Sequence, residues 1–166
     1  ERPVSAELIR PGDNGGFAVD CGIRIQGGGY VRPRYNPNGR LPFSKYSFRL
    51  YFRGDYGTGR LEYPLFGDTP VQSFDRIVLR AGMNDHTSPF IKDEWARRLC
   101  LSTGQVHAKG TFVNLFVNGK YKGYYNPTER IDTKFLADWY QTDENYDVMA
   151  QFNEVRAGTS ASWRKL

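Results

Sequence analysis

The sequence predicts an α+β fold, in which a mostly antiparallel sheet carries one packed main helix and a second, shorter helix. Two observations lead to this expectation. Short stretches that alternate apolar and polar residues recur along the chain between turn residues, which is typical of hairpin-connected strands. Two other segments have apolar residues at helical spacing. With 166 residues, 39% of them hydrophobic, the chain is long enough for one domain with a buried core.

The charge balance narrows the kinds of partner. The formal net charge is +5, but the basic residues are scattered singly among acidic ones rather than gathered in a run. We therefore expect anionic small ligands or acidic partners, and no nucleic acid. No apolar run approaches the roughly 20 residues that span a bilayer, so we expect no membrane insertion.

The amino-terminal half predicts strands around a glycine-rich loop. The segments Val4 to Ile9 and Phe17 to Ile25 alternate on either side of a Pro-Gly-Asp-Asn-Gly-Gly turn and predict a hairpin. The hairpin leads into three consecutive glycines, Gly27 to Gly29, and a loop rich in proline and asparagine. An aromatic-rich strand is expected over Lys45 to Phe52, and a third long strand over Phe74 to Arg80.

The clearest helix is expected from Phe90 to Thr103. Ser88 can cap its amino terminus, and Gly104 can end it. Three apolar residues at helical spacing predict one face that packs on the sheet: Ile91, Trp95 and Leu99.

The carboxy-terminal part predicts a hairpin, a helix and a last strand. Lys109 to Val117 and Lys120 to Tyr125 flank Asn118-Gly119, the strongest short hairpin signal. A second helix is expected over Asp132 to Tyr140, and a final short strand over Tyr146 to Ala150.

The glycines and the strand that follows them predict a polyphosphate site. Backbone N–H groups at Gly27 and Gly28 can approach an anion closely because glycine has no Cβ. Side chains two apart on a strand share a face, so Lys45, Ser47 and Arg49 are expected to face the ligand. Tyr46, Phe48 and Leu50 are then expected to pack into the core. The alternative is an ordinary turn beside a basic, solvent-facing strand.

Two further arginines lie on predicted strands. Arg24 stands between Ile23 and Ile25, so it faces the opposite side of its strand and contacts either a phosphate or solvent. Arg80 ends its strand, where it contacts a phosphate or braces the start of the main helix. The sequence leaves these alternatives open.

The order of elements is that of a protein-kinase amino-terminal lobe: glycine-rich cover, strand cation, helix acid, then two strands that lead to a hinge. Several long segments also resemble the CotH family of spore-coat and secreted kinase-like proteins, over nearly the whole chain from Glu1 to Met149. These segments are GIRIQGGG, KYSFRLYFRGDYGTGRLEYPLF, FDRIVLRAGMND, FIKDEWARRL and FVNLFVNGKYKGYYNPTERID. The resemblance implies an atypical protein kinase that transfers phosphate from ATP, with magnesium or manganese, to serine or threonine of other proteins in the spore coat or outside the cell.

The resemblance also implies roles for single residues. Asp93 is the helix acid that it favours for orienting Lys45 or Arg49. The neighbouring Glu94 and a simple helix-dipole role remain alternatives. The segment from Tyr124 to Glu129, which includes Tyr125, occupies the hinge position, where backbone groups would read the adenine edge. Glu129 is expected either to meet the ribose or to pair with Arg130 or Lys134.

The domain expectation follows from the same likeness. Residues 1–150 would form the kinase-like amino-terminal lobe with its hinge and following helix, and residues 151–166 the start of a truncated carboxy-terminal region. The catalytic and metal-binding aspartates of such kinases lie in the carboxy-terminal lobe, so we assign no catalytic or metal-binding residue here. By itself the fragment is expected to be inactive, with that lobe and a protein substrate as its partners.

A competing interpretation is an exported β-rich interaction or adhesion module that binds no nucleotide. Its binding surface would consist of Tyr56, Tyr63, Trp95, Tyr124, Tyr125 and the Arg53-Gly54-Asp55 turn. The two cysteines, Cys21 and Cys100, are expected to be buried free thiols, although export would permit a disulfide between them. With His86 and His107 they match no zinc spacing.

Overall fold

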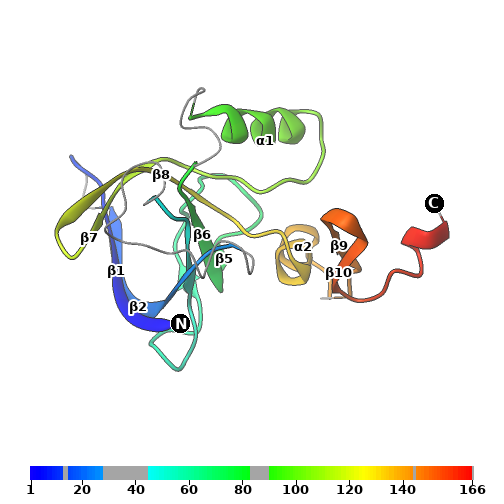
Figure 1. The fold of residues 1–166 in the computed structure, drawn as a ribbon, viewed down its shortest axis with the longest axis horizontal. Helices are drawn as coiled ribbons and strands as arrows, with labels where there is room; N and C mark the ends of the chain where they lie inside the picture. The colour runs from blue at the N-terminus through cyan, green and yellow to red at the C-terminus, as the bar shows by residue number, and fades with distance from the viewer. Residues whose placement is uncertain (13–14, 28–44, 83–89, 144, 166) are drawn as a thin grey trace.

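The computed structural model describes residues 1–12, 15–27, 45–82, 90–143 and 145–165. Its main feature is a six-stranded sheet in which every neighbouring pair is antiparallel (Figure 1). The strands, in spatial order, are β1 (Arg2–Ile9), β2 (Gly16–Ile25), β3 (Phe48–Tyr51), β6 (Arg76–Arg80), β8 (Lys120–Thr128) and β7 (Val113–Val117). The predicted α+β class is confirmed.

Within the described residues, two helices and two small hairpins accompany this sheet. The helices are α1 (Lys92–Ser102) and α2 (Thr133–Tyr140). The hairpins join β4 (Leu61–Glu62) to β5 (Ser73–Phe74), and β9 (Val148–Ala150) to β10 (Glu154–Ala157). Single 3₁₀ turns are η3 (Gln151–Asn153) and η4 (Trp163–Lys165). The expected division after residue 150 falls inside the β9–β10 hairpin, and the division itself stays a prediction.

Both predicted helices are confirmed, with ends set by local chemistry. Gly104 follows α1 with a φ of 80°, and its N–H donates to the carbonyl of Leu101 at 3.0 Å. Asp132 caps α2, because its carboxylate accepts a hydrogen bond from the N–H of Phe135 at 3.1 Å. The predicted cap at Ser88 lies outside the described residues.

The predicted hairpins are confirmed as well. β1 pairs with β2, and β7 pairs with β8 across a turn in which Asn118 and Gly119 have φ values of 50° and 72°. Two consecutive positive φ values suit the twist of the flanking strands. The basic strand is shorter than expected, since β3 begins at Phe48 and Lys45 precedes it.

The sheet has an apolar face and a polar face. Residues directly opposite each other in an antiparallel ladder point to the same side. One such row joins Ile23, Leu50 and Ile77 and belongs to the core, which β4, β5 and α2 complete. The next row along the strands joins Arg24 to Arg49 and then to Val78. The second face is therefore the polar one.

Helix α1 lies on the polar face, over β6 and β8 (Figure 1). The prediction that its apolar face packs on the sheet is wrong. The exposed fractions of its three predicted packing residues are 54% for Ile91, 62% for Trp95 and 49% for Leu99. The buried residues of α1 are instead Glu94 and Arg97. The reason is that the sheet beneath the helix presents polar partners, and these accept charged side chains rather than hydrocarbon.

Candidate functional site

A network of charged groups fixes α1 to the polar face. Arg80, the last residue of β6, forms an ion pair with Asp93 in the first turn of α1 at 2.8 Å. Arg97 also pairs with Asp93, and it pairs with Glu94 at 2.6 Å. On β8, the amide of Asn126 donates to Glu94 at 3.2 Å and accepts a hydrogen bond from Arg97. The network therefore joins the end of β6, the first turns of α1 and the last part of β8.

Glu94 is the buried centre of this network, with 3% of its surface exposed. Burial raises its pKa, but hydrogen bonds from Arg97, Arg98 and Asn126 outweigh that effect and hold the pKa below its usual range. Arg98 contributes through its Nε, which lies 2.7 Å from Oε1 of Glu94. Glu94 is therefore ionised, and its carboxylate is held by groups within the protein. Asp93 lies beside the end of β6.

The cation that pairs with the helix acid differs from the predicted one. We expected Lys45 or Arg49 to pair with Asp93 or Glu94, and the structure shows that this is wrong, because Arg80 is the strand cation that contacts Asp93. The cause is the order of elements. The chain passes from β3 through β4, β5 and β6 before it reaches α1, so the strand that leads into the helix is β6.

Lys45 makes contacts within the protein, and its expected contact with a phosphate stays a prediction. Its Nζ donates to the carbonyl of Tyr124 at 2.6 Å and lies 4.6 Å and 5.0 Å from the ring centroids of Phe90 and Tyr125. Burial lowers the pKa of its ammonium group. Lys45 therefore bridges to β8. Ser47 is also engaged within the protein, because its Oγ accepts a hydrogen bond from the N–H of Ala81 at 2.9 Å.

Three arginines surround the ring of Tyr51, which lies on β3. Arg24 lies on β2, Arg49 on β3 and Arg53 in the turn after β3. We call Arg24, Arg49 and Arg53 the arginine cluster. Their Cζ atoms lie 5.4, 5.7 and 4.8 Å from the centroid of the Tyr51 ring. Arg49 also donates from Nη1 to the Tyr51 hydroxyl at 3.2 Å. The aromatic face accommodates all three cations.

The arginine cluster carries positive charge that the described residues balance only weakly. Arg24 and Arg49 lie directly opposite each other, which is unfavourable for like charges. Burial lowers the pKa of Arg49, and the nearby charges of Arg130 and Arg24 lower it further. In the described part of the chain, the buried Nε of Arg49 has no hydrogen-bond partner. The ion pair that Arg53 makes with Glu1 spans 3.6 Å. This donor set fits an anion such as a phosphate.

The glycine part of the predicted site is described only at its start. Gly27 follows β2 with a φ of 143°, a backbone conformation that favours glycine. Gly28 lies outside the described residues. The phosphate-covering loop therefore stays a prediction.

The predicted hinge begins as regular strand. Tyr124 to Thr128 belong to β8, and the Tyr125 side chain lies in the core, 1% exposed, with its hydroxyl donating to the carbonyl of Tyr46 at 2.9 Å. The side chain of Tyr125 therefore does not face a ligand. An adenine contact through its backbone stays a prediction.

Glu129 does not form either of its expected ion pairs, and its contact with a ribose stays a prediction. It is 4% exposed, and its Oε2 accepts a hydrogen bond from the N–H of Lys109 at 2.7 Å, so the structure pairs it with neither Arg130 nor Lys134. Burial raises the pKa of Glu129 to about 7, opposed by the hydrogen bond and charge of Lys109. Its role is to join the end of β8 to the segment after α1.

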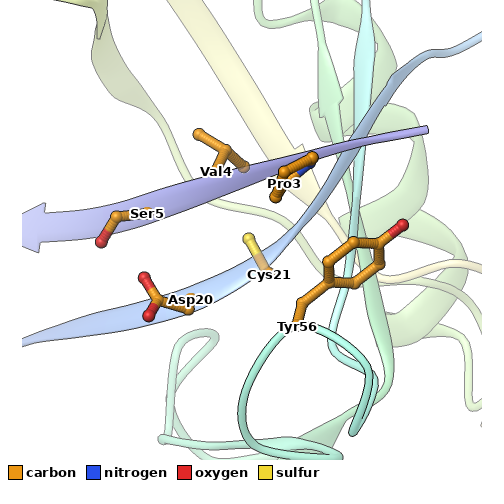
Figure 2. Close-up of a pocket in the computed structure, with 6 residues that line it drawn as sticks. All are labelled: Pro3, Val4, Ser5, Asp20, Cys21 and Tyr56. Carbon is orange, nitrogen blue, oxygen red and sulfur yellow. The ribbon is translucent and has the colours of Figure 1, made fainter.

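A separate hollow of about 350 Å³ lies between β1, β2 and the turn after β3 (Figure 2). Its lining residues are Pro3, Val4, Ser5, Asp20, Cys21 and Tyr56. None of the predicted phosphate-binding residues is among them. Burial raises the pKa of the Cys21 thiol to about 11, with a smaller contribution from Asp20, so this thiol is a poor nucleophile. Both cysteines are free and Cys21 is buried, as expected, but the expectation that Cys100 is buried is wrong, because it is exposed on α1.

The described residues contain no group of three or more histidine, cysteine, aspartate and glutamate side chains arranged to hold a metal ion. Their helices are also too short or too polar to cross a bilayer.

Comparison with known proteins decides the family. A family model described as CotH kinase protein matches residues 23–162. The chain belongs to the CotH kinase family. The match includes all strands of the main sheet except β1 and the first part of β2, and it includes both helices. A search of the curated proteins found no match.

The structure agrees with one of the two alternatives given for Arg80, because Arg80 braces the start of α1 through Asp93, while its contact with a phosphate stays a prediction. Sequence reasoning missed one feature of this CotH chain. Tyr51 stands two residues after Arg49, so the two share a face and the ring could have been predicted beside the guanidinium.

Proposed function

We propose that this CotH chain is the ATP-binding lobe of an atypical protein kinase that phosphorylates serine or threonine of coat or extracellular proteins. One observation carries the proposal: the 2.8 Å ion pair between Arg80 at the end of β6 and Asp93 in the first turn of α1. In protein kinases, a strand cation that pairs with an acid of the next helix holds the nucleotide phosphates. Arg80 is in that position here.

The arginine cluster supports the same proposal. Arg24 and Arg49 belong to the polar face, which also carries Arg80. Phosphoryl transfer depends on positioning and on neutralising the charge of the phosphates. A surface with several cations, one of them with an orphaned Nε at Arg49, suits that task.

Membership of the CotH family implies ATP with magnesium or manganese. The orphaned guanidinium nitrogen fits the phosphates of ATP, but the described residues offer no ligand set for the metal, so we derive no step through it. The proposed partners are a protein substrate and a carboxy-terminal lobe. The proposed location is the spore surface or the outside of the cell.

Nucleotide binding by the chain tests the proposal. ATP with magnesium or manganese at 100 times its dissociation constant should stabilise the folded chain by about 2.7 kcal/mol in thermal denaturation. Arg80→Ala and Arg49→Ala should each weaken ATP binding about tenfold or more, because each removes a charge-assisted contact of about 1.5–3 kcal/mol. Arg80→Lys should retain part of the affinity.

The matched control is Arg156→Ala. Arg156 lies on β10, is about half exposed and pairs with Glu154, so its loss should leave ATP affinity unchanged. Circular dichroism establishes that each variant remains folded. Equal ATP affinity in Arg49→Ala, Arg80→Ala and Arg156→Ala would overturn the proposal that the polar face of the sheet binds ATP.

A second candidate is the exported interaction module. The exposed side chains of Trp95 and Tyr124, at 62% and 44%, favour it, whereas the buried Tyr125 cannot contribute to such a surface. The two functions separate in the same experiment, because an interaction module shows no stabilisation by ATP with either metal.

A further inference from the structure

An unusual feature of α1 is its outward-facing apolar ridge. We define the outer ridge as Ile91, Trp95 and Leu99, which are 54%, 62% and 49% exposed. They follow one another at i, i+4 and i+8, so they lie within an arc of about 80° on the helix surface. Such a narrow strip is the width of a helix-packing seam.

The helix is anchored by charges on its opposite side, which is why the ridge stays outside. Glu94 and Arg97 are its buried residues, and Asp93 pairs with Arg80 on the sheet. Turning the helix to bury the outer ridge would break this network, because Arg80 and Asn126 on the sheet would lose the carboxylates of Asp93 and Glu94. The outer ridge is therefore exposed to solvent on a helix that ion pairs and hydrogen bonds hold to the sheet.

The charges that border the ridge are cations. At 100° per residue, Lys92 and Arg98 lie about 60° to either side of Trp95. Lys92 is exposed, and the Arg98 side chain is 62% exposed although its Nε contacts Glu94. The acids of α1 all point inward, as described above. The outer ridge is thus an apolar strip bordered by Lys92 on one side and, on the other, by Arg98, which is paired with Glu94 and donates to the carbonyl of Gly110.

We propose that the outer ridge of α1 docks an amphipathic helix of another protein, one whose apolar strip is bordered by acidic residues. Three side chains spaced by four residues form a ridge that fits the groove of a facing helix. Lys92 and Arg98 would then meet carboxylates on both sides, which favours this partner electrostatically. The docking is independent of nucleotide binding, since the ridge points away from the polar face.

Two other occupants fit less well. A second copy of the chain would bring its own cations to the border of the ridge, where like charges repel. A lipid surface prefers a helix with a wide apolar face, and the ridge of α1 occupies only a narrow arc above a helix tied to the domain.

Binding of designed peptides to the chain tests the proposal. The probe is a fluorescein-labelled, helix-forming peptide of about four turns, with leucines on one strip and glutamates on both borders. Its counterpart has lysine at every glutamate position. Fluorescence anisotropy should show binding of the acidic peptide and at least tenfold weaker binding of the basic one.

Two substitutions connect binding to the ridge. Trp95→Ala should weaken binding of the acidic peptide at least tenfold, because it removes the largest side chain of the outer ridge. Lys92→Glu should weaken binding of the acidic peptide about two- to fivefold and improve binding of the basic peptide. The matched controls are Trp163→Ala and Lys120→Glu, which change an exposed tryptophan and an exposed lysine elsewhere and should have no effect.

Several outcomes would overturn the proposal. The first is no binding of the acidic peptide up to about 1 mM, and the second is equal binding by Trp95→Ala and Trp163→Ala. A third is concentration-dependent dimerisation that Trp95→Ala abolishes, which would identify a second copy as the occupant. A fourth is ridge-dependent binding to vesicles of equimolar phosphatidylserine and phosphatidylcholine without peptide binding, which would identify a membrane.

Discussion

The buried carboxyl of Glu129 makes a prediction about how stability depends on pH. Its Oε2 accepts a hydrogen bond from the N–H of Lys109, whereas Oε1 has no partner in the part of the chain that the structure describes. Burial raises the pKa from the ordinary 4.5 to about 7. The folded chain therefore binds more protons than the unfolded chain between these two pH values.

The sign of the effect follows from this excess of protons. The stabilising contribution of Glu129 is fully present below pH 4.5 and is lost as the pH rises through about 7. Each pKa unit corresponds to about 1.4 kcal/mol, so the loss between pH 4.5 and pH 8 is about 3 kcal/mol. A Glu129→Gln variant keeps an acceptor for Lys109 but does not titrate, so it escapes this loss.

The assay is urea unfolding of both proteins at pH 4.5 and pH 8. The free energy of unfolding of Glu129→Gln, relative to the unaltered chain, should increase by about 3 kcal/mol between the two pH values. Glu7→Gln, which changes an exposed glutamate on β1, is the control and should show no such increase. If the difference for Glu129→Gln is the same at both pH values, the carboxyl titrates normally and the argument from its burial is wrong.

Two further predictions concern the anchor of α1 and the two thiols. Glu94→Ala should lower the free energy of unfolding by about 3 kcal/mol, because it breaks a buried ion pair. This value is at the lower end of the range for such pairs, since Arg97 keeps its second partner, Asp93. At pH 8, Cys100 should react quickly with an aromatic disulfide reagent, whereas Cys21 should react only on unfolding, since it is buried and has a pKa of about 11.

Each of these has a control on the same chain. Glu154→Ala breaks an exposed ion pair with Arg156 and should change the free energy of unfolding by at most about 0.5 kcal/mol. An equal loss in the two glutamate variants would contradict the anchoring role of Glu94. Cys100→Ser should abolish the fast thiol reaction, and a fast reaction that survives in this variant would show that Cys21 is accessible.

The local signals in the sequence were sufficient for most elements. Asn118-Gly119 predicted its hairpin because two consecutive residues with positive φ suit few other structures. Gly104 marked the end of α1, and the expected start of α2 at Asp132 agrees with the cap that its side chain makes in the structure. The candidate site was predicted less well. Arg49 and Arg24 belong to the cationic cluster, but the pairing of Asp93 was assigned to the wrong cation.

The sequence by itself determined the family, the antiparallel hairpins and both helices, because these depend on residues that are neighbours along the chain. Only the tertiary structure decided which side of α1 meets the sheet and which cation holds Asp93. Glu94 can be buried only because Arg97 and Asn126 satisfy its charge, and Asn126 comes from a distant strand. The helical spacing of Ile91, Trp95 and Leu99 carries no information about that partner. A prediction from this spacing alone therefore placed the wrong side of α1 against the sheet.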